Sequence, residues 1–329
     1  MAGVTGGRRM RAIQVQETGG PEVLRIENVA DPRPGDGEVL IRVHAAGVNF
    51  ADYLARIGAY PPAGRPPLIP GLEAGGVVEA VGPGVTGVEI GQRVMAWARG
   101  TYAELAVAPA WAVYPAPETI SLEEAAAIPI VFGTAWHALV SVASLQRDEW
   151  VLVHAAGGGV GSAAVQVARQ LGARVIATAG QDWKLERARE LGADAVAGYE
   201  DFAETARQAT DGRGVDVVLE GVGKATFAAS VRSMAPGGRM VIYGAPSGPR
   251  VELDTREAIT RNLTLYGISV ISSPLFPATT ESFAREALAW FDEGRLRPVV
   301  DRVYPLEEAA EAHRRLMDRD HFGKLVLRV

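Results

Sequence analysis

The sequence contains no cysteine among its 329 residues. This absence excludes disulfide bonds, thiolate metal sites, a cysteine nucleophile and CxxC redox chemistry. Positive charge is also in deficit, because 33 Lys and Arg face 39 Asp and Glu, which leaves a net charge of -6. Such a balance argues against a nucleic acid or an anionic membrane surface as the partner.

We also expect neither a secretory leader nor a membrane span. No charged segment followed by an apolar one opens the chain, so we predict a cytoplasmic location. The uncharged stretch 125–145 is long enough to cross a bilayer. Alanine, proline, glycine and hydroxyl residues dilute its hydrophobicity, however. We therefore predict that it is a buried helical segment between two domains.

The length favours two domains, at ~150 residues each. Residues 1–9 have the composition of a flexible extension. Short Val-rich runs separated by Gly and Pro predict a compact β domain over residues 10–126. Over residues 127–270, apolar runs alternate with helical stretches, which is typical of βαβ units and a parallel sheet. The strands predicted in residues 271–329 alternate polar and apolar residues, which indicates a return to the first, half-exposed domain.

A glycine-rich loop is the strongest local motif. The segment Ala155–Gly161 reads AAGGGVG, follows an apolar strand and leads directly into a helix. A dinucleotide fingerprint needs glycine where the chain turns, where backbone approaches a pyrophosphate and where helix meets strand. Gly158 and Gly161 take the second and third roles, and Ala156 replaces the first glycine. The alternative is a tight strand-to-helix turn that binds no ligand.

The end of the next predicted strand indicates which dinucleotide binds. An NAD site places Asp or Glu there to bind the ribose hydroxyls, whereas this chain has Ala179-Gly180. Lys184, one of only three lysines, follows at the start of the next helix. We therefore predict NADPH in preference to NADH, although Asp182 weakens this preference and a solvated role for Lys184 stays open.

Several further motifs make the chain resemble the zinc-free quinone oxidoreductase branch of the medium-chain dehydrogenase/reductase superfamily. They are Gly47 to Asp52, Gly58 to Pro62, Pro70 to Gly76, His154 to Gly161, and Arg319 with Gly323 to Val326. The resemblance implies an α/β protein with a GroES-like β domain built from both ends of the chain and a Rossmann domain between them. It also implies an active site in the cleft between the two domains.

The family's cofactor contacts carry over to specific positions. They fall on Asn49, Thr134, Gly157, Gly158, Gly159, Val160, Gly161, Gly180, Lys184, Tyr199, Tyr243, Gly244, Ala245 and Arg319. Tyr199 has an alternative role, as an aromatic side chain that packs on the sheet.

The resemblance also concerns zinc, which related alcohol dehydrogenases bind through cysteine and a Gly-His-Glu motif. Here that motif reads Gly71-Leu72-Glu73, and Asn49 stands at the position of the first cysteine ligand. Leucine cannot bind a metal, so the soft ligands that hold zinc are missing. The five histidines show no metal-binding spacing, and we predict no metal site.

Without a Lewis acid, the accessible reaction is hydride transfer to an electron-poor quinone or α,β-unsaturated carbonyl. We predict that Asn49 contacts the nicotinamide or the substrate oxygen and that Tyr53 or Tyr60 supplies the proton. Two alternatives stay open, namely an enoyl-thioester reductase and an NADPH-binding protein without catalytic activity. The apolar segment 263–270 is expected at a sheet edge, which predicts a homodimer joined there.

Overall fold

The computed structural model describes residues 8–329, with the backbone alone at residue 271. The chain forms two compact units, one ending at Ile130 and completed by Thr280–Val329, the other comprising Val131–Thr279. The sequence prediction set the corresponding boundaries at residues 126 and 270. In the structure the second unit ends at Thr279, inside helix α9 (Phe276–Ala287). Of the extension predicted at 1–9, residues 1–7 lie outside the described part, and Arg9 already belongs to the first strand.

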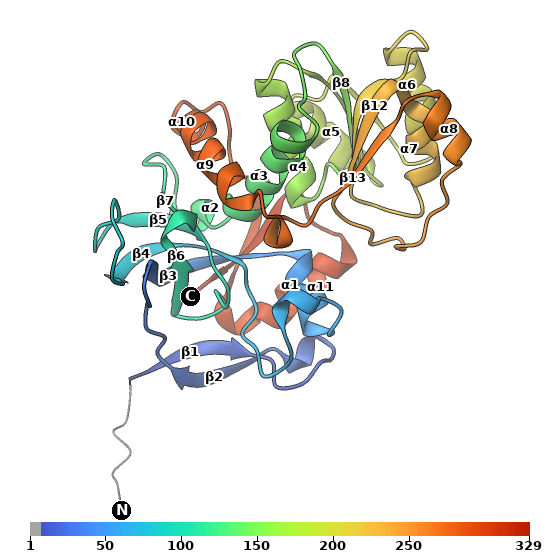
Figure 1. The fold of residues 1–329 in the computed structure, drawn as a ribbon. Coiled ribbons are helices and arrows are strands. Elements are labelled where there is room, and N and C mark those ends of the chain that lie inside the picture. The colour runs from blue at the N-terminus through green and yellow to red at the C-terminus, as the bar shows by residue number, and fades with distance from the viewer. Residues whose placement is uncertain (1–7) are drawn as a thin grey trace, which may run out of the picture. The chain divides into compact units, whose positions relative to one another are not determined.

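The first unit is mainly β-structure (Figure 1). Its strands are β1 (Arg9–Gln14), β2 (Arg25–Ala30), β3 (Glu38–Val48), β4 (Glu73–Val81), β5 (Arg93–Trp97), β6 (Leu105–Pro109), β7 (Val113–Pro115), β14 (Val300–Pro305) and β15 (Lys324–Arg328). Its helices are α1 (Phe50–Arg56), α2 (Leu122–Ala125), α10 (Ala289–Asp292) and α11 (Ala309–Asp318), with short 3-10 turns η1 (Pro21–Val23), η2 (Pro61–Ala63), η3 (Ala110–Ala112) and η6 (Leu306–Glu308).

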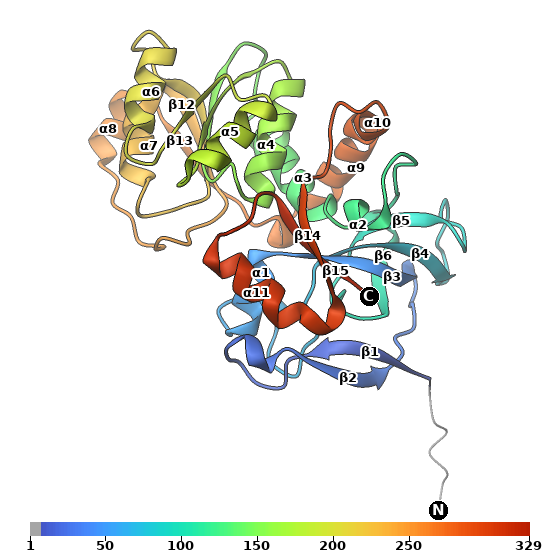
Figure 2. The same cartoon turned by 180° about the vertical axis from the view of Figure 1, so that it is seen from behind.

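Strand β3 organises this unit, because it pairs antiparallel with β4, β6 and β15. The sheet order is β14-β15-β3-β4-β5-β7, so the C-terminal strands extend the sheet begun by the N-terminal ones. Strand β15 does not alternate as predicted, since Lys324 to Leu327 are all buried. It lies inside the sheet between β14 and β3, and α2 and α11 both contact it (Figure 2).

The second unit is the doubly wound parallel sheet predicted from the sequence. Its strands are β8 (Trp150–Val153), β9 (Arg174–Thr178), β10 (Ala195–Ala197), β11 (Val215–Glu220), β12 (Met234–Ile242) and β13 (Thr264–Gly267). Its helices are α3 (Pro129–Trp136), which begins at the unit boundary, α4 (Gly159–Gln170), α5 (Asp182–Glu190), α6 (Phe202–Ala209), α7 (Phe227–Ser233) and α8 (Thr255–Thr260), with the π-helix η4 (His137–Val142) and the 3-10 turn η5 (Val270–Ser272).

The strand order of this sheet is β10-β9-β8-β11-β12-β13, and every pair is parallel. Chain direction across the sheet therefore reverses between β8 and β11, and ligands of such sheets bind outside the carboxyl ends at that point. Helix α4 contacts β8 and β9, whereas α6 and α7 pack on an apolar face that includes Leu152 and Val218.

The uncharged stretch 125–145 is helical and largely buried, as predicted. It is divided among the end of α2, helix α3 and the π-helix η4. Within residues 8–329, no helix is both long and apolar enough to span a membrane.

Candidate functional site

The glycine loop lies at the carboxyl end of β8, beside the reversal point of the parallel sheet. Helix α4 begins at Gly159, and Gly158 is its N-cap residue. The loop thus directs the free backbone N–H groups of a helix N-terminus to the place where such sheets bind phosphates. Gly157, Gly158, Gly159, Val160 and Gly161 all belong to this turn, as the sequence predicted.

The glycines of this turn are needed because neighbouring atoms come close to their Cα atoms. They are not needed for unusual backbone angles. The positive φ of the turn falls on Ala155, at 51°. A Cβ atom on Gly161 would lie 2.2 Å from the carbonyl oxygen of Ala155, so any side chain there would push α4 away from the loop. Ala156, assigned the first-glycine position, is fully buried, and its N–H donates to the carbonyl of Thr178 at 2.9 Å.

Lys184 lies next to this loop. It sits in the first turn of α5 and is 8% exposed. A Cβ atom on Gly157 would come within 2.7 Å of the Lys184 Cδ atom, so the lysine stem crosses the loop where the glycine leaves room. Its ammonium group lies 5.2 Å from the ring centroid of Trp183, a favourable cation–π position.

Gly180 and Tyr199 complete this group at the second strand. A Cβ atom on Gly180 would be 3.5 Å from Tyr199 Cε2, so the tyrosine ring covers the end of β9. The ring centroids of Tyr199 and His154 are 6.4 Å apart. The structure therefore gathers four predicted cofactor residues, Gly157, Gly180, Lys184 and Tyr199, at the carboxyl ends of β8 and β9.

His154 joins three of the elements around the loop. Its Nδ1 atom lies 2.8 Å from Thr178 Oγ1, and its Nε2 atom lies 2.8 Å from Ser230 Oγ. Burial lowers the pKa of His154 to about 4, although the nearby Glu220 carboxylate opposes this shift. The imidazole is therefore neutral at pH 7, and its hydrogen bonds connect the end of β8 to the end of β9 and to helix α7.

Glu220, which sequence reasoning missed, shapes the loop after β11. Its Oε1 atom accepts hydrogen bonds from the N–H groups of Val222 at 2.8 Å and Gly223 at 2.9 Å. Its carboxylate also accepts from the hydroxyls of Thr226 and Ser230. The only signal in the sequence was an acidic residue ending an apolar strand.

The segment Tyr243 to Ala245 follows β12 and packs on the same loop. A Cβ atom on Gly221 would be 2.3 Å from the Tyr243 hydroxyl oxygen, and one on Gly223 would be 2.9 Å from Ala245 Cα. Burial and the Glu220 charge raise the pKa of Tyr243, so its hydroxyl stays protonated. Gly244 lies between Tyr243 and Ala245 in the chain. Thr134, another predicted cofactor residue of this unit, is a buried residue of α3.

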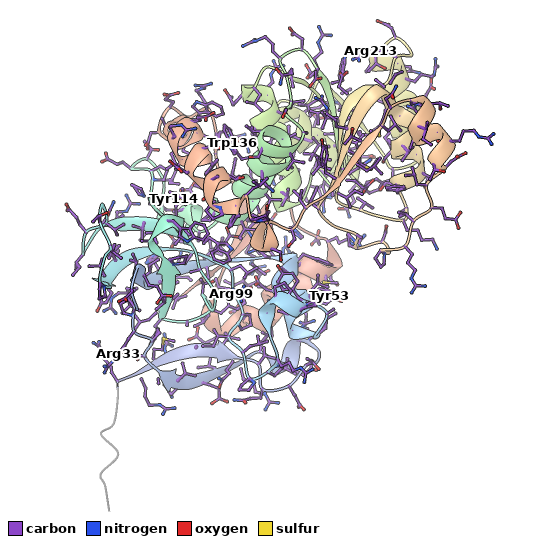
Figure 3. The ribbon with its side chains drawn as sticks, viewed as in Figure 1. Arg33, Tyr53, Arg99, Tyr114, Trp136 and Arg213 are labelled. Atoms are coloured by element: carbon purple, nitrogen blue, oxygen red, sulfur yellow. The ribbon has the colours of Figure 1, made fainter. Side chains whose placement is uncertain are left out.

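The remaining predicted residues belong to the first unit. Tyr53 lies on α1 (Figure 3). Its ring is 5.2 Å from that of Phe50 and 5.2 Å from the Arg56 guanidinium carbon. Tyr60 precedes the short turn η2, and Arg319 ends α11 with a φ of 56°.

Asn49 is the N-cap residue of α1, a helix that the sequence analysis did not predict. Its N–H donates to Asp52 Oδ2 at 2.8 Å, which begins the helix. Its side-chain amide nitrogen donates to Glu73 Oε1 at 2.9 Å, and its Oδ1 atom accepts from Lys324 Nζ at 2.7 Å. Lys324 and Glu73 form an ion pair of 2.7 Å that is almost completely buried. Asn49 is thus part of a buried charged network.

A second buried group continues from the same helix. Asp52 Oδ1 accepts from the N–H of Gly71 at 3.1 Å, and Asp52 Oδ2 accepts from the Tyr102 hydroxyl at 3.1 Å. The Tyr102 oxygen is also 3.3 Å from His313 Nε2. Burial raises the pKa of Asp52 to about 6 and, with the charge of Arg56, lowers that of His313 to about 3. Asp52 is ionised and His313 neutral at pH 7.

The donor set beside Asn49 does not suit zinc. Leu72 offers no ligand atom, and the Glu73 carboxylate already binds the Lys324 ammonium group. Among residues 8–329, no three His, Asp or Glu side chains gather as a metal-binding group.

Two protein families match this chain, and each match covers much of one of the two units. Residues 35–118 match the alcohol dehydrogenase GroES-like domain, and residues 159–290 match the family described as zinc-binding dehydrogenase. The two matches define an oxidoreductase of the medium-chain dehydrogenase/reductase superfamily and confirm the predicted combination of a GroES-like and a Rossmann domain. A quinone oxidoreductase of Sus scrofa is 37% identical over 332 aligned residues, covering 98% of this chain and 99% of that protein. The chain belongs to the quinone oxidoreductase branch of this superfamily.

Two solved structures bear on the finer assignment. A mycobacterial protein described as complexed with NADPH is 38% identical, with a TM-score of 0.90 over 97% of this chain and 100% of that one. The CurK enoyl reductase is 28% identical, with a TM-score of 0.87 over 98% of this chain and 99% of that one.

Proposed function

We propose that this oxidoreductase uses NADPH to reduce a quinone or an α,β-unsaturated carbonyl compound without zinc. The observation that carries the proposal is Lys184, whose stem crosses Gly157 at the start of the phosphate-binding turn. No carboxylate follows β9 directly, because the chain continues as Ala179-Gly180. A lysine beside this turn favours a cofactor with an additional phosphate on its ribose.

The residues present fit the adenosine part of such a cofactor. Gly158 and the first turn of α4 would hold the pyrophosphate, Lys184 the additional phosphate, and Tyr199 the adenosine side. When bound, NADPH supplies a hydride from its nicotinamide ring. We assign the remaining positions, Thr134, Tyr243, Gly244, Ala245 and Arg319, to further cofactor contacts.

The chain's own contribution to the reaction is mainly orientation and exclusion of water. The proton that completes reduction comes from water or from a hydroxyl group, for which we propose Tyr53 or Tyr60. The donor set at Asn49, Leu72 and Glu73 supports a reaction that is independent of zinc.

Steady-state NADPH oxidation with three acceptors tests this proposal. We expect turnover with 1,4-benzoquinone or a simple enone and little with crotonyl-CoA. Faster turnover with crotonyl-CoA would instead identify an enoyl-thioester reductase, which the likeness to the CurK enoyl reductase supports. Tight NADPH binding without turnover of any acceptor would indicate a protein that only binds the cofactor.

We also propose that the protein is a homodimer joined at β13, an edge strand of the six-stranded sheet. Edge strands present unpaired backbone groups that can pair with a second copy. Large apolar side chains are exposed on β13 and in the segments near it in sequence, at Val251, Leu253, Ile259 and Tyr266.

A further inference from the structure

The ammonium group of Lys324 has a complete set of partners. Its Nζ atom donates to the carbonyl of Val48 at 2.8 Å, to Asn49 Oδ1 at 2.7 Å and to Glu73 Oε1 at 2.7 Å. A lysine has three N–H donors, so each one is used. The position of this buried cation is therefore defined by three directed hydrogen bonds.

Glu73 is held equally firmly. Its Oε1 atom accepts from both Lys324 and Asn49, and its Oε2 atom accepts from the N–H of Ile130 at 2.8 Å. A Cβ atom on Gly47 would lie 2.4 Å from Oε1, so Gly47 leaves the space that this carboxylate fills. Ile130 is the last residue of the N-terminal segment of the first unit, and this hydrogen bond holds its backbone N–H against Glu73.

These two charges determine the orientation of the Asn49 amide. The Nδ2 group donates to Glu73 Oε1 at 2.9 Å and to the carbonyl of Gly47 at 3.3 Å, which uses both of its hydrogens. A flipped amide would place NH₂ against the Lys324 ammonium and oxygen against the Glu73 carboxylate. Both contacts would be repulsive, so only the observed orientation is compatible with the network.

Only one hydrogen-bonding function of the Asn49 side chain then remains for a ligand. Oδ1 accepts from Lys324 and keeps a second lone pair, whereas Nδ2 has no hydrogen left. The residue as a whole is 7% exposed, so it is not completely sealed. A ligand that binds Asn49 must approach with an N–H or O–H donor.

We propose that Lys324 and Glu73 are positioning residues that hold Asn49 as a hydrogen-bond acceptor, so that it contacts an amide or hydroxyl donor of the bound cofactor and not the carbonyl oxygen of the acceptor. This inference rests on the proposed NADPH-dependent function. It narrows the role of Asn49, for which contact with either the nicotinamide or the substrate oxygen was predicted.

A double-mutant cycle tests the positioning role. Replacing both charges together, as Lys324→Met with Glu73→Gln, avoids leaving one buried charge without its partner. We expect this pair to lower kcat/KM for NADPH, with 1,4-benzoquinone as acceptor, by about tenfold, which corresponds to one lost hydrogen bond of ordinary strength. In an Asn49→Ala background the same pair should change kcat/KM by less than about twofold, because its effect passes through Asn49.

The matched control is the exposed pair Arg42–Glu79, which joins β3 to β4 in the same sheet. Arg42→Met with Glu79→Gln should leave kcat/KM unchanged. An equal loss from the buried pair with and without Asn49 would overturn the positioning role, as would wild-type activity of the buried-pair variant.

A second pair of substitutions, which exchanges the amide and the carboxylate between positions 49 and 73, tests the acceptor role independently of the double-mutant cycle. Asn49→Asp keeps an acceptor but places a carboxylate oxygen against Glu73, so we expect at least a tenfold loss of NADPH affinity in a fluorescence titration. Adding Glu73→Gln removes this repulsion between carboxylates and leaves the introduced carboxylate as the negative charge that pairs with Lys324, so it should restore the affinity to within about threefold of wild type. Failure of this second change to restore binding would show that Asn49 acts as a donor. If the wild-type protein neither bound NADPH nor reduced the quinone, the proposed function itself would be wrong.

Discussion

The stem of Lys184 crosses the glycine turn at Gly157, where a Cβ atom would come within 2.7 Å of the lysine Cδ. A residue at the start of α5 is thereby placed beside the N-terminus of α4. Because β8 and β9 are adjacent and parallel, the turns that follow them open on the same edge of the sheet. The glycine turn and Lys184, which are separate features in the sequence, therefore form one candidate phosphate site.

Lys184→Ala should reduce the use of NADPH selectively. A hydrogen bond to a charged group contributes about 1.5–3 kcal/mol, so we expect kcat/KM for NADPH to fall on the order of 10- to 100-fold. The value for NADH should change little, because NADH lacks the additional phosphate. Arg189→Ala, which removes an exposed arginine at the end of the same helix, is the control. Equal losses with both cofactors would assign Lys184 a structural role.

Gly161→Ala should destabilise the second unit and weaken NADPH binding together. The added Cβ would be 2.2 Å from the Ala155 carbonyl oxygen, and backbone atoms cannot move away as a side chain can. Overpacking of this kind costs about 1–3 kcal/mol, which urea unfolding can measure. Gly198→Ala, at a glycine with no neighbouring atom within 4 Å of its Cβ position, should be close to neutral. A stable Gly161→Ala protein with normal NADPH affinity would contradict this account.

The two predicted proton donors can be separated by removing one hydroxyl at a time. We expect either Tyr53→Phe or Tyr60→Phe to lower kcat with 1,4-benzoquinone by about 10²-fold or more, as general acids typically contribute. The KM for NADPH should change much less, because proton delivery follows cofactor binding. A variant that retains full turnover eliminates that tyrosine, and full turnover in both variants assigns the proton to water.

Stability should fall as the pH drops from 7 to 5, in part through His154. The folded protein holds the pKa of His154 at about 4, whereas the unfolded chain has the ordinary value of 6.5. Protons therefore bind the unfolded state first, and His154 should account for roughly 2 kcal/mol of lost stability over this interval.

The His154→Gln variant should be less stable at pH 7, but its stability should vary less between pH 7 and 5. Asp52 changes stability in the opposite direction, because its raised pKa of about 6 makes the folded state the better proton acceptor. An unchanged pH slope in His154→Gln would show that this imidazole is not held neutral by burial.

Charged residues on the proposed dimer surface should dissociate the dimer. The chain mass is 34.8 kDa, so sedimentation of a wild-type dimer should give about twice that value at micromolar concentration. Ile259→Lys combined with Tyr266→Lys places one charge on α8 and one on the edge strand β13 and should yield the monomer. Ile90→Lys, at an exposed isoleucine of the first unit, should not. A monomeric wild-type protein would overturn the proposal.

Much of the second unit could be predicted because its signals are local. Strand β9 ends directly before Ala179-Gly180, as predicted, and the turn from β8 into α4 lies where the glycines indicated. Predictions failed where tertiary packing decides the outcome. Helix α1 has only seven residues and is begun by the Asn49 cap, and β15 is buried because neighbouring strands and helices enclose it.

The sequence by itself determined the class of fold and the phosphate-binding turn, because each of these depends on residues that are close together in the chain. Only the tertiary structure decided how Asn49 is held. Its partners Glu73 and Lys324 are 24 and 275 residues away, and no periodicity or spacing relates positions so distant. Pairing of β15 with β3 brings them together, since this strand pairing places a lysine from the end of the chain beside a cap near its beginning. The missing cysteines excluded a thiolate metal site, and the fold shows that a lysine ammonium group binds the Glu73 carboxylate.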